Sequence, residues 1–200
     1  AIVDRVTVTL FAPLLAALLT VTAWKLVTGG LHLDGLADCL DGLIGRDPAQ
    51  RLAIMKDSRI GAFGAIGLVL FLLLETAAVS GIDPLARGRA LVLAPVIGRA
   101  MPPLVARVFP PVGSGQGARF RAEVGTAAVV LALALALVVA AAALGLRGVL
   151  ALALGVTLAL AGGRGMTRRR GGVSGDVHGA VIELAELIVL LTVAAAYPAR

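Results

Sequence analysis

Residues 124–144, VGTAAVVLALALALVVAAAAL, decide the class of fold, because this run consists almost entirely of Val, Ala and Leu. At about 1.5 Å per residue, a helix of this length covers the roughly 30 Å hydrocarbon core of a bilayer. Five further apolar runs occupy residues 6–27, 61–81, 90–109, 148–162 and 176–197, of which the run at 148–162 is short. The sequence therefore predicts an all-α, polytopic integral membrane helix bundle with about six transmembrane spans.

The composition agrees with a bilayer as the solvent. Of the 200 residues, 59% are hydrophobic and 15% are charged, whereas soluble domains average about 45–50% and 25%. Residues 1–200 are expected to form a single membrane-embedded domain. The net charge of +6 comes from basic residues that flank apolar runs, a pattern that serves topology and contact with the lipid bilayer. We expect no nucleic-acid partner.

The basic residues also predict the orientation. Segments 29–60, 110–123 and 163–175 hold ten Lys or Arg residues, and the opposite side holds five. Because cytoplasmic loops carry the excess of Lys and Arg, these three segments, and an active site built from them, should face the cytoplasm. Within the spans, Pro95, Pro102 and Pro103 predict a kinked or broken helix. Glu75 and Arg99 are lone charges there that could pair with one another, or Arg99 could reach a substrate.

An acidic segment follows the first apolar run: GGLHLDGLADCLDG, residues 29–42. Asp34, Asp38 and Asp41 are spaced i, i+4 and i+7, so a helix places them on one stripe. Like charges on neighbouring turns repel, and carboxylates beside a membrane span are costly unless a cation lies among them. Oxygen ligands favour Mg²⁺, although a solvated acidic face is the alternative. His32 could be a ligand, a general base or a residue that caps the helix start.

Two further motifs carry charges that suit phosphate chemistry. In residues 56–59, KDSR, Asp57 could be a fourth metal ligand while Lys56 and Arg59 bind phosphate oxygens; the alternative is a surface ion pair. Residues 168–176, RRRGGVSGD, resemble an anion cradle at a helix start, or a basic membrane anchor with a serine cap. Asp176, Glu183 and Glu186 follow on the last predicted helix. They could form a second face of the same metal site.

Three sequence blocks resemble the signature of the cobalamin synthase family, whose members are also called adenosylcobinamide-GDP ribazoletransferases. The blocks are residues 30–38 with Asp41 and Gly42, residues 55–61 with Gly64, and residues 171–177 with Glu183. Residues 94–99 are similar to a fourth, weaker block. The resemblance runs from residue 28 to the end of the chain, with Ser174 where Thr is common and His178 where an aliphatic residue is common. We expect the family's amino-terminal segment to be missing from this sequence.

The resemblance implies a Mg²⁺-dependent enzyme of the bacterial cytoplasmic (inner) membrane. Such an enzyme transfers the adenosylcobinamide phosphate group from adenosylcobinamide-GDP to α-ribazole or α-ribazole 5'-phosphate and releases GMP. The sequence leaves open whether the chain forms a homo-oligomer. The expected metal ligands are Asp34, Asp38, Asp41 and Asp57; the expected catalytic residues are His32, Lys56 and Arg59; and the expected substrate-binding residues are Arg99, Gly171, Gly172, Ser174, Asp176 and Glu183.

Two other functions remain open at this point. Asp38, Asp41 and Gly42 resemble the opening of the CDP-alcohol phosphotransferase motif, but the Ala-Arg pair that should follow is absent. A cation transporter would also place carboxylates within a membrane, near the middle of its spans. Here nearly all the acids lie at one predicted membrane edge, which favours the enzyme.

Overall fold

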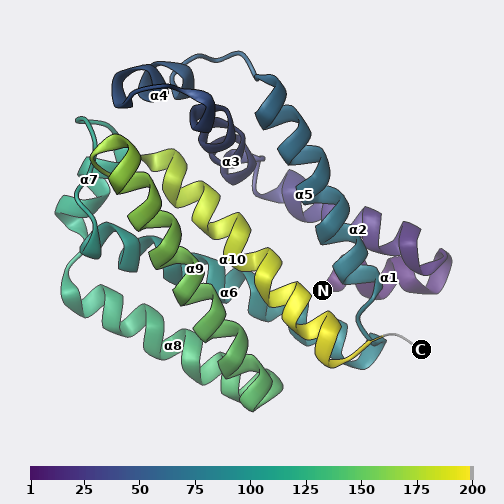
Figure 1. The fold of residues 1–200 in the computed structure, drawn as a ribbon. Coiled ribbons are helices and arrows are strands. Elements are labelled where there is room, and N and C mark those ends of the chain that lie inside the picture. Colours follow the sequence, from purple (N-terminus) through teal and green to yellow (C-terminus); the bar gives the residue numbers. More distant parts are fainter. Residues whose placement is uncertain (199–200) are drawn as a thin grey trace.

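The structure, a computed structural model, describes residues 1–198. These residues form a polytopic helical membrane protein, as the sequence predicts. Five helices are long and apolar enough to cross a membrane, and there are six such segments if the bent pair of α2 with α3 counts as one span. The elements, labelled in Figure 1, are α1 (Ile2–Leu10), α2 (Pro13–Val27), α3 (Leu31–Asp41), the 3₁₀ turn η1 (Gly42–Ile44), α4 (Pro48–Met55), α5 (Ala62–Ser80), α6 (Pro84–Val108), α7 (Gln116–Glu123), α8 (Thr126–Leu144), α9 (Leu146–Arg170) and α10 (Gly175–Ala196).

Helix α10 is the centre of the bundle and packs against α3, α5, α6, α7 and α9 (Figure 1). Its crossing with α3 is close because glycines lie at the contact. A Cβ atom on Gly35 would lie 2.6 Å from the carbonyl oxygen of Asp176, and one on Gly179 would lie 3.2 Å from the Cα of His32. Small residues allow this approach of helix backbones within a membrane. The crossing brings the acidic helix α3 against the start of α10.

The prediction of one continuous span over residues 6–27 is wrong. Helix α1 ends at Leu10, and α2 begins at Pro13, which has no backbone N–H to continue a helix. The two helices pack against one another, and the Thr7 hydroxyl donates a hydrogen bond to the Ala16 carbonyl (3.3 Å). Helix α2 ends before Gly29 and Gly30, both with positive φ, and α3 departs at 92°. The first apolar run is therefore divided between α1 and α2, and α2 with α3 makes a bent pair.

Two other boundaries differ from the prediction. Helix α6 runs without a break through Pro95, Pro102 and Pro103, because it packs against α8, α9 and α10, and packing within a bundle compensates for lost helix hydrogen bonds. Helix α9 extends from Leu146 to Arg170, well beyond the short apolar run at 148–162. Most of segment 163–175 is therefore the end of a helix rather than a loop.

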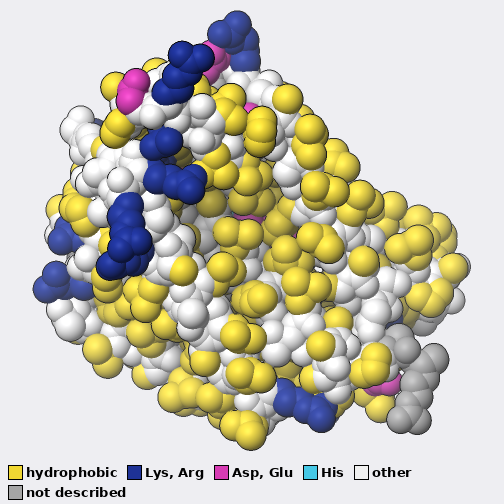
Figure 2. Space-filling view, viewed as in Figure 1, with side chains coloured by type: hydrophobic (Ala, Val, Ile, Leu, Met, Phe, Trp, Pro, Cys, Tyr) yellow, Lys and Arg dark blue, Asp and Glu magenta, His cyan; other side chains and the backbone are white. Residues whose placement is uncertain are grey.

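The three basic segments meet at one end of the bundle. The Val112 amide donates to the Val173 carbonyl (3.0 Å), and the Val173 amide donates to the Pro110 carbonyl (2.9 Å). An Arg51 guanidinium nitrogen donates to the Arg169 carbonyl (3.1 Å). Figure 2 shows most of the visible Lys and Arg side chains gathered at this end. The predicted grouping of the segments is confirmed.

The gathering of these segments predicts a sidedness that cysteine labelling can measure. With Cys39 replaced by alanine, single cysteines would be introduced at the exposed positions Gln50, Ser114 and Arg168 and, at the other end, at Leu85 and Leu146, which are each 84% exposed. In intact cells, a membrane-impermeant maleimide should react with positions 85 and 146 only. Mixed reactivity among positions 50, 114 and 168 would contradict the shared face.

Candidate functional site

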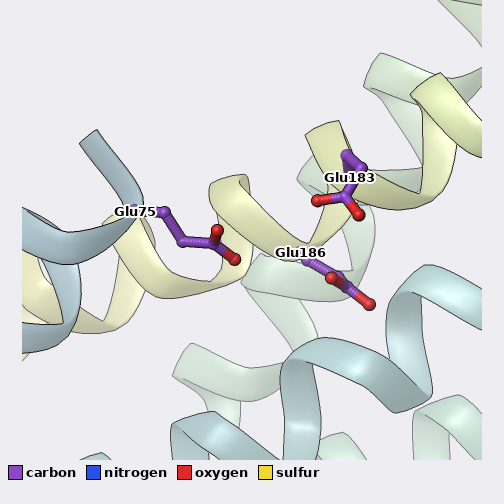
Figure 3. A group of neighbouring side chains, drawn as sticks. All are labelled: Glu75, Glu183 and Glu186. Carbon is purple, nitrogen blue, oxygen red and sulfur yellow. The ribbon is translucent and has the colours of Figure 1, made fainter. Parts of the chain in front are cut away.

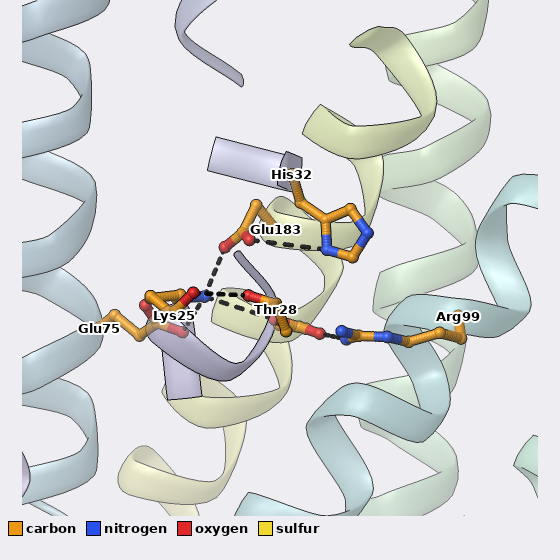
Figure 4. A network of polar contacts seen from close by, with 7 residues as sticks. Lys25, Thr28, His32, Glu75, Arg99 and Glu183 are labelled. Carbon is orange, nitrogen blue, oxygen red and sulfur yellow. Dashed lines mark hydrogen bonds and ion pairs between the residues drawn. The ribbon is translucent and has the colours of Figure 1, made fainter. Parts of the chain in front are cut away.

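A buried ammonium group lies at the centre of a network of charges inside the bundle. Lys25 Nζ on α2 lies 2.9 Å from Glu75 Oε1 on α5 and 2.5 Å from Glu183 Oε2 on α10. It also lies 3.5 Å from Glu186 Oε2, and Glu186 in turn pairs with Arg99 on α6. We call these five residues the Lys25 network (Figure 4). The pairing of Glu75 with Arg99 that the sequence suggested does not occur.

The three glutamates of the Lys25 network form the only group of three metal-ligating side chains found among the residues that the structure describes, with ligand oxygens within 4.8 Å of one another. Figure 3 shows that Glu75 comes from one helix and that Glu183 and Glu186 come from another. Their side chains are at most 2% exposed. The Lys25 ammonium group lies among them, and the Arg99 guanidinium group also pairs with Glu186, so both side chains supply counter-charge to the carboxylates. Glu183, which was predicted to bind substrate, is held in this buried network.

Glu183 also links the Lys25 network to α3. His32 Nδ1 lies 4.0 Å from Glu183 Oε1, and the His32 side chain is 20% exposed (Figure 4). His32 is thus placed between the buried network and a cavity that opens at the polar end of the bundle.

Two of the three predicted site motifs line a cavity of about 420 Å³, which we call the acidic cavity. Asp34 and Asp38 on α3 face it, together with Lys56, Asp57 and Arg59 from the segment between α4 and α5. The carboxylates of α3 therefore line one wall, and the segment between α4 and α5 brings two cations and one carboxylate to another. Phosphate groups that carry a divalent cation would complement both walls.

Asp57 is exposed, and Arg59 already contacts it. Arg59 Nη2 lies 2.7 Å from Asp57 Oδ2, and the Arg59 side chain and backbone both donate hydrogen bonds to this carboxylate. These hydrogen bonds lower the pKa of Asp57 to about 2. Asp57 therefore stays ionised at neutral pH, and a metal ion would have to share it with Arg59.

Asp41 does not line the acidic cavity, although the sequence grouped it with Asp34 and Asp38. Its carboxylate accepts hydrogen bonds from the backbone amides of Gly61 and Gly64, each at 2.8 Å. These amides lie at the start of α5 and lack partners within the helix. Asp41 therefore caps α5 from α3, and its burial follows from that contact.

A second, larger cavity of about 590 Å³ lies on the other side of Asp34, between α3, α6, α7 and α10. We call it the aromatic cavity, because Phe120 and His178 line it with their rings edge to face, 5.5 Å apart between centroids. Asp34 lines both cavities. The remaining side chains that decide its character are Leu31, His32, Arg99, Pro102, Pro103, Gln116, Asp176 and Ile182.

Only some residues of the glycine-rich motif before α10 line a cavity. Gly171 ends α9 with φ +81°, and Gly172 packs against the backbone of Pro110 and Pro111. Neither glycine lines the cavities described. Ser174 donates a hydrogen bond to Asp176 Oδ2 (3.1 Å), and both residues line a third cavity that Lys56 also borders. Of the predicted substrate-binding residues in this motif, Ser174 and Asp176 therefore line a described cavity, and Gly171 and Gly172 do not.

Sequence reasoning missed several residues that the structure places at or beside the site. Neither Lys25 nor Phe120 was predicted from the sequence to belong to the site. An unpaired charge in an apolar run is a signal that a partner lies on another helix. Phe120 carries no such signal, because an aromatic residue on a short helix is ordinary in sequence.

Comparisons with known proteins agree with the resemblance of the motifs. The sequence profile of the family described as cobalamin-5-phosphate synthase matches residues 1–194. A protein of Brevibacillus brevis named adenosylcobinamide-GDP ribazoletransferase is 36% identical over 91% of this chain and 75% of its own length. Proteins of the same name from Stutzerimonas stutzeri and Roseiflexus are 43% and 39% identical over 92% of this chain and 76% and 69% of their own lengths. No solved structure matches the chain.

The Lys25 network makes a prediction about stability. Lys25→Met leaves buried glutamates without their ammonium partner, which should lower the free energy of unfolding by about 3–5 kcal/mol. Lys56 is the matched control because it is the other lysine of the chain and is exposed. Lys56→Met should change stability by less than about 0.5 kcal/mol. Denaturant unfolding in detergent measures both variants; equal stability of Lys25→Met and wild type would contradict the role of Lys25.

Proposed function

The chain belongs to the cobalamin-5-phosphate synthase family, and we propose that it transfers the adenosylcobinamide phosphate group from adenosylcobinamide-GDP to α-ribazole or α-ribazole 5'-phosphate, with release of GMP. It is a transferase of cobalamin synthesis. The observation that carries the proposed reaction is the position of Asp34 between two cavities of different character. A reaction between two substrates requires such a shared point.

We assign the acidic cavity to the diphosphate of the donor. Asp34, Asp38 and Asp57 line this cavity and offer only oxygen ligands, although the ligand oxygens of the three do not all lie within 4.8 Å of one another. This donor set fits Mg²⁺, which binds to one or two carboxylates together with water and substrate phosphate oxygens. Mg²⁺ held there would neutralise the charge of the diphosphate.

The other groups of the acidic cavity act on the phosphate oxygens directly. Lys56 and Arg59 would bind them from the opposite wall, and Arg59 is oriented for this by its ion pair with Asp57.

His32 borders the aromatic cavity near Asp34, where it would accept the proton of the attacking hydroxyl group. Arg99 borders the same cavity and would pair with the 5'-phosphate of a phosphorylated acceptor.

Two observations disfavour the alternatives. A cation transporter needs carboxylates free to bind cargo, but the glutamates buried within the bundle are paired with Lys25 and Arg99. A CDP-alcohol phosphotransferase would use Asp41 in its motif, but this carboxylate caps α5.

The excess of basic residues supports an active site on the cytoplasmic face of the bacterial inner membrane.

A direct test is release of GMP by purified protein supplied with adenosylcobinamide-GDP, α-ribazole and Mg²⁺. Asp34→Asn and Asp38→Asn should each lower kcat about 100-fold or more, because a metal ion stabilises transition-state charge by several kcal/mol. Asn keeps the size of the side chain, so both variants should unfold like wild type. Chelation of Mg²⁺ should stop wild-type turnover. Normal turnover by both variants would exclude the proposed metal site.

The variant Asp41→Asn distinguishes two roles of Asp41, namely capping α5 and binding a metal ion. The variant loses one acceptor of the α5 amides, so stability should fall by about 1 kcal/mol, and the Mg²⁺ concentration needed for half-maximal activity should stay at the wild-type value. A large increase in that concentration would instead make Asp41 a metal ligand. Asp47→Ala is a control for the loss of a cap, because Asp47 caps α4 at the exposed surface and Ala has no side-chain acceptor.

A further inference from the structure

The aromatic cavity contains a polar side chain that the fold leaves without a partner. His178 is 7% exposed, and neither of its ring nitrogens has a hydrogen-bond partner among the described residues. A buried polar group without a partner costs about 1–3 kcal/mol. Because His178 lines the cavity, a ligand that hydrogen-bonds to it there would remove this cost.

The other walls of the cavity fit an aromatic ligand. Phe120 is set edge to face against His178 at an interplanar angle of 65°, and the apolar side chains of Pro102, Pro103 and Ile182 also line the cavity. Phe120 is half-buried, so part of its ring remains free to contact a ligand. Aromatic rings prefer offset or edge-to-face contacts with one another.

Size and charge distinguish the two substrates. The aromatic cavity, at about 590 Å³, lies within the range of roughly 300–1,000 Å³ that encloses small ligands. A benzimidazole nucleoside such as α-ribazole is a ligand of this kind, whereas a corrinoid linked to guanosine diphosphate is far larger. The charged walls of the acidic cavity, by contrast, match the diphosphate of the donor.

We propose that the aromatic cavity binds the acceptor nucleoside and that His178 and Phe120 recognise its base. The imidazole N–H of His178 donates a hydrogen bond to the base nitrogen that carries no ribose, while the base packs against Phe120. The ribose then points toward Asp34, where the two cavities meet. This assignment rests on the proposed function, and it names the residues that determine which base is accepted.

The test compares binding of two nucleosides to the purified full chain by calorimetry, without donor. α-Ribazole carries the acceptor nitrogen, and the indole riboside has a C–H group in its place. Wild type should bind α-ribazole about tenfold more tightly than the indole riboside, the worth of one buried hydrogen bond. His178→Leu should bind both nucleosides alike, and His178→Gln, which keeps an N–H donor, should retain the preference.

The variant Phe120→Leu tests the contact between the base and the Phe120 ring independently of His178. It should weaken binding of both nucleosides about three- to tenfold and leave the preference unchanged. Phe63→Leu is the matched control, because Phe63 on α5 is 56% exposed and does not line the aromatic cavity; its affinities should equal those of wild type. Thermal unfolding checks that each variant is folded.

The proposal is overturned if wild type does not distinguish the two nucleosides, or if folded His178→Leu keeps the full preference. It is also overturned if Phe120→Leu binds both as wild type does. Release of GMP is measured separately. Absence of GMP with intact, His178-dependent nucleoside binding would refute the proposed transfer and leave the binding site supported.

Discussion

The ion pairs of Lys25 with glutamates of α5 and α10 are the constraint on which the arrangement of the site depends. A charged group in a membrane must be paired, so the position of Lys25 on α2 fixes where α5 and α10 pack against it. Lys25 lies two residues before the end of α2, at Val27. The same contacts therefore hold the point from which the chain turns into α3, the helix that carries Asp34 into both cavities.

After α2, the geometry of the backbone determines where the residues of the site lie. Gly29 and Gly30 adopt positive φ, which residues with a side chain rarely do, and they turn α3 by 92°. Gly35 and Gly179 then let α3 approach the start of α10, so Gly35 lies close to the backbone of Asp176 and His32 lies close to Glu183. Asp41 at the end of α3 caps α5 and so joins these two helices. Asp34 thereby borders both cavities without being part of the buried network.

The sequence predicted the features that depend on local pattern, and it failed where distant helices decide. Apolar runs revealed the spans, and the spacing of Asp34 and Asp38 placed both on one face of α3. Pro13 was present as a signal but was outweighed by the apolar run around it. The partners of Lys25, Glu75 and Arg99 could not be predicted, because pairing depends on how four helices pack. The role of Asp41 was hidden for the same reason, since its partners follow 20 and 23 residues later.

The proposed reaction requires donor and acceptor to meet at Asp34, each from its own cavity. The most direct measurement is an experimental structure of the protein with Mg²⁺, α-ribazole and a donor analogue whose diphosphate bridge is a methylene group. We expect the diphosphate to lie between Asp38 and Arg59, and the nucleoside base to lie between Phe120 and His178. The attacking hydroxyl group should lie beside Asp34. A structure with both ligands in one cavity, or with the metal ion bound by Glu75, Glu183 and Glu186, would contradict it.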